Sequence, residues 1–284
     1  DDALRETIRA IKNGQIVALK GLGGFQLLCD ARNEKSVREL RRRKRREEKP
    51  FALMFPDIES ARAECEISDA EQRLLLSAAA PIVLLARRNG ASRIASAVAP
   101  QNPTLGVMLP YTPLHALCLK ELNFPVVATS GNLAEEPICI DEREALARLR
   151  SVAHLFLAHD RPIARHLDDS VVKIVCGRPQ LLRGARGYAP LAIPLKNTAP
   201  AILAVGGHLK NTVAITAGCH IFMSQHIGDL ESRPACVAFL KTANDLPKLY
   251  NISPRRVARD LHPDYFSTQY AQSINARDVA AQHH

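Results

Sequence analysis

The sequence contains no tryptophan, and aromatic residues make up only 5% of its 284 residues. Proteins that bind single-stranded nucleic acid by base stacking need aromatic platforms, so the composition argues against that class. No run of eighteen apolar residues occurs, which argues against a membrane-spanning helix and against a membrane partner. The opening string DDALRETIRAIKNG has the pattern of an amphipathic helix and not that of a signal peptide.

Paired cysteine motifs are also missing. The seven cysteines are scattered, their number is odd, and none forms a CxxC pair. This spacing argues against structural zinc and against a disulfide framework. Most of them lie in apolar surroundings, as buried reduced thiols do, so the expected location is the cytoplasm.

The positive charge is concentrated in one segment. The net charge is +9, and residues 38–49 alone hold eight Lys or Arg against three Glu. A local cluster of this kind indicates one polyanionic partner rather than a uniformly cationic surface.

Short aliphatic runs alternate with helical stretches over the first two hundred residues, which indicates an α/β (α+β) fold with a mixed sheet. The expected helices are 33–46, 57–64 and 68–78, and the expected strands are 16–20, 25–29, 50–55, 81–86, 105–109, 124–130, 154–158, 170–176 and 178–184. Three prolines and no helical period between 189 and 200 favour a linker, which we place at 191–200. Beyond it we expect a β-meander, a helix at 234–249 interrupted by Pro247, and a strand at 255–261. The predicted domains are therefore 1–190 and 201–284.

Four segments could carry chemistry, and each allows a structural interpretation as well. Six basic residues, 41–46, end the second predicted helix, which Pro50 should stop. They could stabilise the helix terminus or form a phosphate cradle, with about even odds. The turn 129–132, after an apolar strand, could line a ligand cleft or simply cap the next helix.

The other two segments are equally open. Glycines in the stretch 20–24 could let the backbone approach a phosphate, although such a stretch is more often a hairpin. Asp168 and Asp169 could hold Mg²⁺ or orient a base, although a structural ion pair is the commoner role. Arg183 and Arg186 could reach phosphate or lie at the domain boundary.

In this order, these segments resemble the KxR…SxN signature of the YrdC superfamily, over about residues 1–190. The longer strings KGLGGFQLLCDA, LRRRKRREEKPFALM, LGVMLPYTPLH, ATSGNLAEEPI, RPIARHLDDSVV and LLRGARGYAP resemble the HypF family of carbamoyltransferases, which mature nickel–iron hydrogenases. Further strings, GGHLKNT, SQHIGDLE and DLHPDYFST, resemble the start of that family's Kae-like domain. The resemblance implies a YrdC-like twisted mixed sheet followed by a partial lobe of the actin and sugar-kinase type.

The resemblance also implies a reaction. Carbamate, derived from carbamoyl phosphate, would attack the α-phosphorus of ATP with Mg²⁺ present. The carbamoyl group would then pass to the C-terminal cysteine of a hydrogenase-maturation partner. There it would supply the cyanide ligand of the nickel–iron site. Lys44 and Arg46 would be catalytic. Residues expected to bind nucleotide or carbamate are Lys20, Gly21, Gly23, Gly24, Lys49, Thr129, Ser130, Asn132, Arg183 and Arg186.

The sequence departs from the family pattern at both ends. The acylphosphatase and zinc-finger parts that usually come first are absent, so carbamate would have to come from elsewhere. The final residues, with His283, resemble the beginning of the family's QHHHAH metal motif, or they are a polar tail. Adenylation is therefore expected here, without complete transfer.

Two other functions stay open. The basic cluster at 41–46 could bind nucleic acid such as double-stranded RNA, independently of sequence and with strong salt dependence. An O-carbamoyltransferase that acts on a small molecule would join the same two domains. A threonylcarbamoyl-adenylate synthase is disfavoured, because that enzyme does not carry a fused Kae-like segment.

Overall fold

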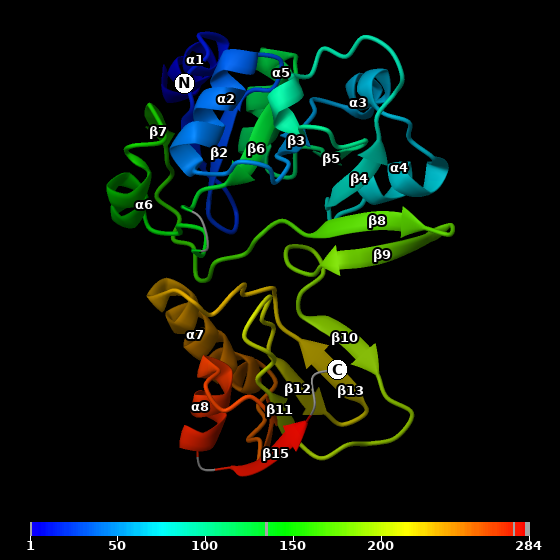
Figure 1. Ribbon diagram of the computed structural model, residues 1–284, viewed down its shortest axis with the longest axis vertical. Coiled ribbons are helices and arrows are strands. Elements are labelled where there is room, and N and C mark those ends of the chain that lie inside the picture. Colours follow the sequence, from blue (N-terminus) through cyan, green and yellow to red (C-terminus); the bar gives the residue numbers. More distant parts are fainter. Residues whose placement is uncertain (1, 134–135, 275, 282–284) are drawn as a thin grey trace. The chain divides into compact units, whose positions relative to one another are not determined.

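The computed structural model describes residues 2–133, 136–274 and 276–281 (Figure 1). The chain groups into two compact units. The first comprises Asp1–Ala134 and Ile138–Gly187, and the second comprises Glu135–Pro137 and Tyr188–His284. All candidate site residues from Lys20 to Arg186 belong to the first unit.

A mixed sheet of nine strands forms the first unit, in the order β7-β1-β2-β6-β3-β5-β4-β8-β9. The pairs β1–β7, β3–β5 and β4–β8 are parallel, and the other neighbours are antiparallel. Each of the nine strands predicted in this region has a counterpart, which confirms the mixed α/β sheet. The strands are β1 (Val17–Lys20), β2 (Phe25–Asp30), β3 (Ala52–Met54), β4 (Ile82–Ala86), β5 (Thr104–Met108), β6 (Val126–Ser130), β7 (Leu155–Leu157), β8 (Val171–Val175) and β9 (Arg178–Arg183).

Helices cover this sheet. They are α1 (Asp2–Lys12), α2 (Glu34–Lys44), α3 (Ile58–Glu64), α4 (Asp69–Leu75), α5 (Pro113–Leu122) and α6 (Glu142–Leu149), with a short 3-10 helix η1 (Ser96–Val98). Two of these, α5 and α6, are additional to the predicted helices. Thr112 caps α5 by accepting a hydrogen bond from the backbone of its first turn, and Pro113 supplies a preset φ at its first position.

Helix α2 ends earlier than predicted. It begins after Asn33, whose side chain accepts a backbone N–H of the first turn. Val37 and Leu40 bury its apolar stripe against the sheet. It stops because Arg45 adopts a left-handed conformation with φ of 51°, and not because of Pro50. The prediction that the helix reaches residue 46 is therefore wrong by two residues.

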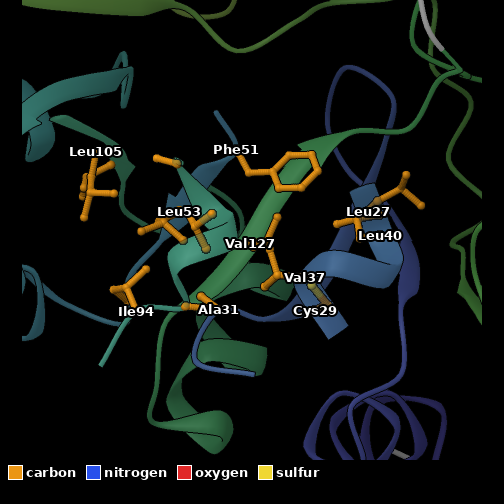
Figure 2. Packing of buried hydrophobic residues seen from close by; sticks show 14 of the residues in the cluster. Leu27, Cys29, Ala31, Val37, Leu40, Phe51, Leu53, Ile94, Leu105 and Val127 are labelled. Carbon is orange, nitrogen blue, oxygen red and sulfur yellow. The ribbon is translucent and has the colours of Figure 1, made fainter. Parts of the chain in front are cut away.

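A buried apolar cluster packs α2 against the centre of the sheet (Figure 2). Leu27 of β2, Leu53 of β3 and Val127 of β6 are fully buried there, together with Val37 and Leu40. A second cluster, which includes Leu19 and Leu28, covers the opposite face. Central strands buried on both faces have continuous apolar sequences, which explains why β2 and β6 are visible as apolar runs.

The second unit is built on a sheet of six strands, in the order β10-β13-β12-β11-β14-β15. Phe239, Leu203 and Val257 lie in its apolar core. The strands β11, β12 and β13 form the predicted meander, with β14 and β15 added in parallel. The elements are β10 (Leu191–Pro194), β11 (Ile202–Ala204), β12 (Ala214–Ala217), β13 (His220–Met223), α7 (Arg233–Leu249), β14 (Arg256–Asp260), α8 (Phe266–Ser273) and β15 (Arg277–Ala281).

Two predictions for this unit need correction. The segment expected to be a linker contains β10, which pairs antiparallel with β13. Proline has no backbone N–H to donate. Since β10 lies at the edge of the sheet, Pro194 can belong to this strand without breaking hydrogen bonds to a strand on each side. Helix α7 also continues through Pro247 to Leu249, so this proline does not interrupt the helix as predicted. Within residues 2–133, 136–274 and 276–281, no helix combines the length and the hydropathy that crossing a bilayer requires.

The packing of β3 gives a stability prediction. Replacing Leu53 by Ala should lower the free energy of unfolding by about 2–5 kcal/mol, since the side chain is fully buried and leaves a cavity. Leu117→Ala is the matched control, because this leucine is 52% exposed on α5 and should change stability by less than about 0.5 kcal/mol. Urea unfolding followed by circular dichroism measures both, and equal losses would contradict the assigned core.

Candidate functional site

The structure brings the basic helix end and the serine–asparagine turn into direct contact. Lys44, the last residue of α2, is only 3% exposed. Its Nζ donates hydrogen bonds to the carbonyl oxygens of Ser130 (2.7 Å) and Asn132 (2.6 Å) and to Oδ1 of Asn132 (2.6 Å). Ser130 Oγ donates to the same Oδ1 at 2.8 Å. Two segments far apart in the sequence therefore form one polar centre at the end of β6.

The ammonium of Lys44 is fully engaged by this turn. Burial lowers the pKa of Lys44 to about 7, and the charge of Arg46 acts in the same direction, while Asp168 opposes it. The three oxygen acceptors match the three N–H donors of a charged lysine, so the geometry favours the ammonium form. Direct contact with a phosphate would require one of these acceptors to be exchanged.

Arg46 lies beside the same turn. Its Nη1 lies 3.4 Å from Thr129 Oγ1, its Nε donates to the carbonyl of Lys49 at 3.0 Å, and its guanidinium lies over the ring of Phe51. Burial, together with the charges of Arg41 and Arg183, lowers the pKa of Arg46 to about 10. The turn is therefore surrounded by positive charges that repel one another.

These cations have few anionic neighbours. Arg183 donates from Nε to the carbonyl of Asp169 at 2.9 Å. Neither Arg46 nor Arg183 forms a salt bridge with any carboxylate of the described residues. Lys49 is exposed next to them, and its charge also lowers the pKa of Lys44. The like charges of Arg46 and Arg183, which no carboxylate of the described residues neutralises by a salt bridge, favour the binding of an anion.

The glycine turn between β1 and β2 packs against protein rather than facing open space. Gly21 N–H donates to the carbonyl of Gly24 at 2.9 Å, and Leu167 N–H donates to the carbonyl of Gly23 at 2.8 Å. A Cβ at Gly23 would lie 2.2 Å from the Leu167 carbonyl oxygen, so this position admits only glycine without rearrangement. The expectation that these glycines approach a phosphate gains no support from these contacts.

Lys20 has a structural environment instead of a phosphate-facing one. Its side chain is 1% exposed and forms an ion pair with Glu142 of α6. It also donates to the carbonyls of His159 (2.9 Å) and Arg161 (2.7 Å). In this structure its donors are taken up by these acceptors, so the contacts of Lys20 lend no support to a role in binding nucleotide.

Asp169 and Arg186 likewise form a structural pair. Arg186 Nη2 contacts Asp169 Oδ1 at 2.9 Å, and the same guanidinium donates to the carbonyls of Ala79 and Ala80. Gln26 Nε2 donates to the other carboxylate oxygen of Asp169 at 2.8 Å. Each carboxylate oxygen of Asp169 therefore accepts a hydrogen bond within the protein, and Arg186 is held by Asp169 and by two backbone carbonyls.

No group of three His, Cys, Asp or Glu that could hold a metal ion occurs in the part of the chain that the structure describes. Asp168 is the remaining acidic candidate, half-buried and close enough to raise the pKa of Lys44. The predicted metal ligand His283 lies outside the described residues.

His115, which no motif in the sequence marks, lies next to the glycine turn. The side chain is fully buried, and neither ring nitrogen has a hydrogen-bond partner among the described residues. Its ring meets that of Tyr111 edge-on, with centroids 4.7 Å apart. Burial lowers the pKa of His115 to about 4, and the charge of Arg186 adds to this. A lone histidine within an apolar string gives no signal of this burial in the sequence.

Comparison with known proteins identifies the family. The model of the Sua5/YciO/YrdC family, described as "Telomere recombination", matches residues 9–185. The chain belongs to the Sua5/YciO/YrdC family. A second model, the HypF Kae1-like domain, matches residues 197–284. Since both domains occur in this order, the resemblance to HypF is confirmed.

Whole-chain relatives agree. Carbamoyltransferase HypF of Synechocystis sp. is 50% identical over 285 residues, which cover 100% of this chain and 37% of that protein. Carbamoyltransferase HypF2 of Cupriavidus necator is 43% identical over 305 residues, covering 100% of this chain and 38% of that protein. A crystal structure of full-length HypF in the phosphate- and nucleotide-bound form has a TM-score of 0.95 at 45% identity, covering 99% of this chain and 45% of that one. The chain spans less than half the length of these relatives.

The burial of His115 predicts a pH dependence of stability. Between about pH 6.5 and about pH 4 the unfolded chain binds a proton on this histidine that the native state excludes. The free energy of unfolding should therefore fall as the pH is lowered from about 7 to about 5. Urea unfolding of His115→Asn should show a smaller fall. Above about pH 7 the free energy of unfolding should change with pH equally in the two proteins, because the histidine is neutral in both the folded and the unfolded state. The same dependence on pH in both proteins between about pH 7 and about pH 5 would contradict the assignment.

Proposed function

We propose that the first unit binds ATP and carbamate at the serine–asparagine turn and forms carbamoyl-adenylate and pyrophosphate. We further propose that residues 1–190 act as the adenylating domain, and that 201–284 are part of a domain that passes the carbamoyl group onward. The observation that carries the proposal is the contact of Lys44 with Ser130 and Asn132 beside Arg46, whose guanidinium forms no salt bridge with a carboxylate of the described residues.

The cations match the charge of the proposed substrate. A triphosphate concentrates negative charge, and arginine binds phosphate oxygens with parallel N–H donors. Arg46, Arg183 and the exposed Lys49 would neutralise the β- and γ-phosphates as pyrophosphate leaves. In this role the site acts mainly by positioning and by electrostatic stabilisation.

The serine–asparagine turn would hold the reacting phosphate. A carbamate oxygen forms a bond to the α-phosphorus, and the bond from that phosphorus to the oxygen bridging to the β-phosphate breaks. Lys44 fixes the Asn132 amide with its oxygen toward the ammonium, so the amide nitrogen faces the other way. That nitrogen would hold the α-phosphate or the carbamoyl oxygen as a neutral donor, and the Ser130 hydroxyl would join it after turning its hydrogen away from Asn132 Oδ1.

ATP is the nucleotide that we propose, with the magnesium ion that accompanies it in solution. The described residues do not build a metal site of their own, because Asp169 is paired with Arg186 and Gln26. No step of the proposed reaction is therefore assigned to a protein-bound metal. The relative described as phosphate- and nucleotide-bound supports nucleotide binding by this fold.

The acceptor is proposed from the relatives. The match to the HypF Kae1-like domain supports transfer to the C-terminal cysteine of a hydrogenase-maturation partner. The cyanide ligand of a nickel–iron site would then derive from the carbamoyl phosphate that supplies the carbamate. A small-molecule hydroxyl acceptor finds no support in the relatives named HypF.

Exchange of labelled pyrophosphate into ATP, in the presence of ammonia and bicarbonate as the source of carbamate, tests the adenylation step. Asn132→Ala should lower the exchange rate by roughly 10²–10³-fold, the loss typical of one transition-state donor. Lys44→Ala should lower it as well, because the Asn132 amide is then no longer fixed by the ammonium. Lys35→Ala is the matched control, because Lys35 is exposed at the other end of α2. Unchanged exchange in both site variants would refute the assignment.

Comparing ligands at two salt concentrations separates the enzyme from a nucleic-acid-binding module. Binding of double-stranded RNA through phosphate contacts should fall by about 10³–10⁵-fold between about 50 mM and about 200 mM salt for six to ten contacts. We expect ATP to bind with a much weaker salt dependence and RNA to bind negligibly at physiological salt. Titration calorimetry with ATP and with an RNA duplex measures both; tight RNA binding with no ATP binding would favour the alternative.

A further inference from the structure

The structure separates Arg41 from the other basic residues of its run. Arg42 and Arg45 are exposed to solvent, whereas Arg41 is only 9% exposed. Burial lowers the pKa of Arg41, although a guanidinium stays charged at any physiological pH. A buried arginine without a carboxylate partner requires other acceptors, and the surrounding backbone supplies them.

The guanidinium of Arg41 is enclosed by carbonyl oxygens from two segments. Nη1 donates to the carbonyls of Arg46 (2.9 Å), Glu47 (3.0 Å) and Lys49 (3.3 Å). Nε and Nη2 donate to the carbonyls of Ala97 and Val98 in η1. One side chain therefore ties the basic loop, residues 45–50, to a helix that is distant in the sequence.

Arg46 adds contacts of its own to the basic loop. Arg46 donates from its own guanidinium to the carbonyls of Lys49 and Pro50. The guanidinium carbons of Arg41 and Arg46 lie 4.6 Å and 5.0 Å from the centroid of the Phe51 ring. The position of Arg46 thus depends on the backbone of a loop whose carbonyl oxygens accept hydrogen bonds from Arg41.

We propose that Arg41 is a positioning residue for the nucleotide site, a role that rests on the proposed function. It fixes the loop backbone so that Arg46 and Lys49 face the serine–asparagine turn, and its own charge adds to the positive potential around Arg46. Lysine cannot take its place, since a single ammonium offers three donors from one point, whereas the planar fork reaches carbonyls on both segments.

Two substitutions separate geometry from charge. Arg41→Lys keeps the positive charge and loses the fork, and Arg41→Gln loses both. We expect each to raise the KM for ATP in pyrophosphate exchange by about 10–100-fold, because misplacing a binding group by about 1 Å has effects of this size. The value of kcat should fall as well, because Arg46 would then be misplaced for neutralising the pyrophosphate that leaves.

Arg42→Gln is the matched control, because Arg42 lies next in the helix, is exposed and pairs only with Glu39. It should leave the KM unchanged. Thermal unfolding of Arg41→Lys, the milder variant, shows whether the protein is folded. If this variant unfolds at a lower temperature but keeps the wild-type KM for ATP, Arg41 is merely structural and the inference fails alone. If the wild-type chain neither binds ATP nor exchanges pyrophosphate, the proposed function fails and the inference fails with it.

Discussion

One buried ammonium group connects the parts of the candidate site. Lys44 donates all its hydrogen bonds to the turn at the end of β6, and this contact joins α2 to a strand formed much later in the chain. A charge buried without acceptors would destabilise the fold by several kcal/mol, so the turn must supply its oxygens. The packing of Val37 and Leu40 against the sheet fixes the position of α2, so that Lys44 at its end reaches the oxygens of the turn. The loop that carries Arg46 depends on the same placement.

The sequence predicted the sheet well for a physical reason. β2 and β6 are buried on both faces and show continuous apolar runs, and the hairpin of β8 and β9 turns at Gly177. The same reasoning failed where tertiary position outweighs local pattern. The sequence predicts a linker where the structure has strand β10. A proline such as Pro194 is compatible with a strand at the edge of a sheet, and β10 lies at such an edge. The sequence does not show this, because it does not give the order of the strands.

The site was predictable in part. The motif spacing, with the family resemblance, selected Lys44, Ser130 and Asn132, which the structure brings together. It could not tell which cations are already neutralised. Lys20 pairs with a glutamate 122 positions away, and Arg186 with Asp169 and two carbonyls. Residue type gives the charge, but only the fold gives the partner, and the partner decides whether a cation is left for a ligand.

The position of β6 in the sheet has a consequence for how the protein is made. This strand lies between β2 and β3, both of which precede it in the chain. Both neighbouring strands leave the ribosome before β6 does. Lys44 can contact the turn at the end of β6 only after β6 has paired between them. A nascent chain that stops short of β6 can bury part of its core but lacks the turn that forms the candidate nucleotide site. Nucleotide binding would therefore report that the central sheet has closed.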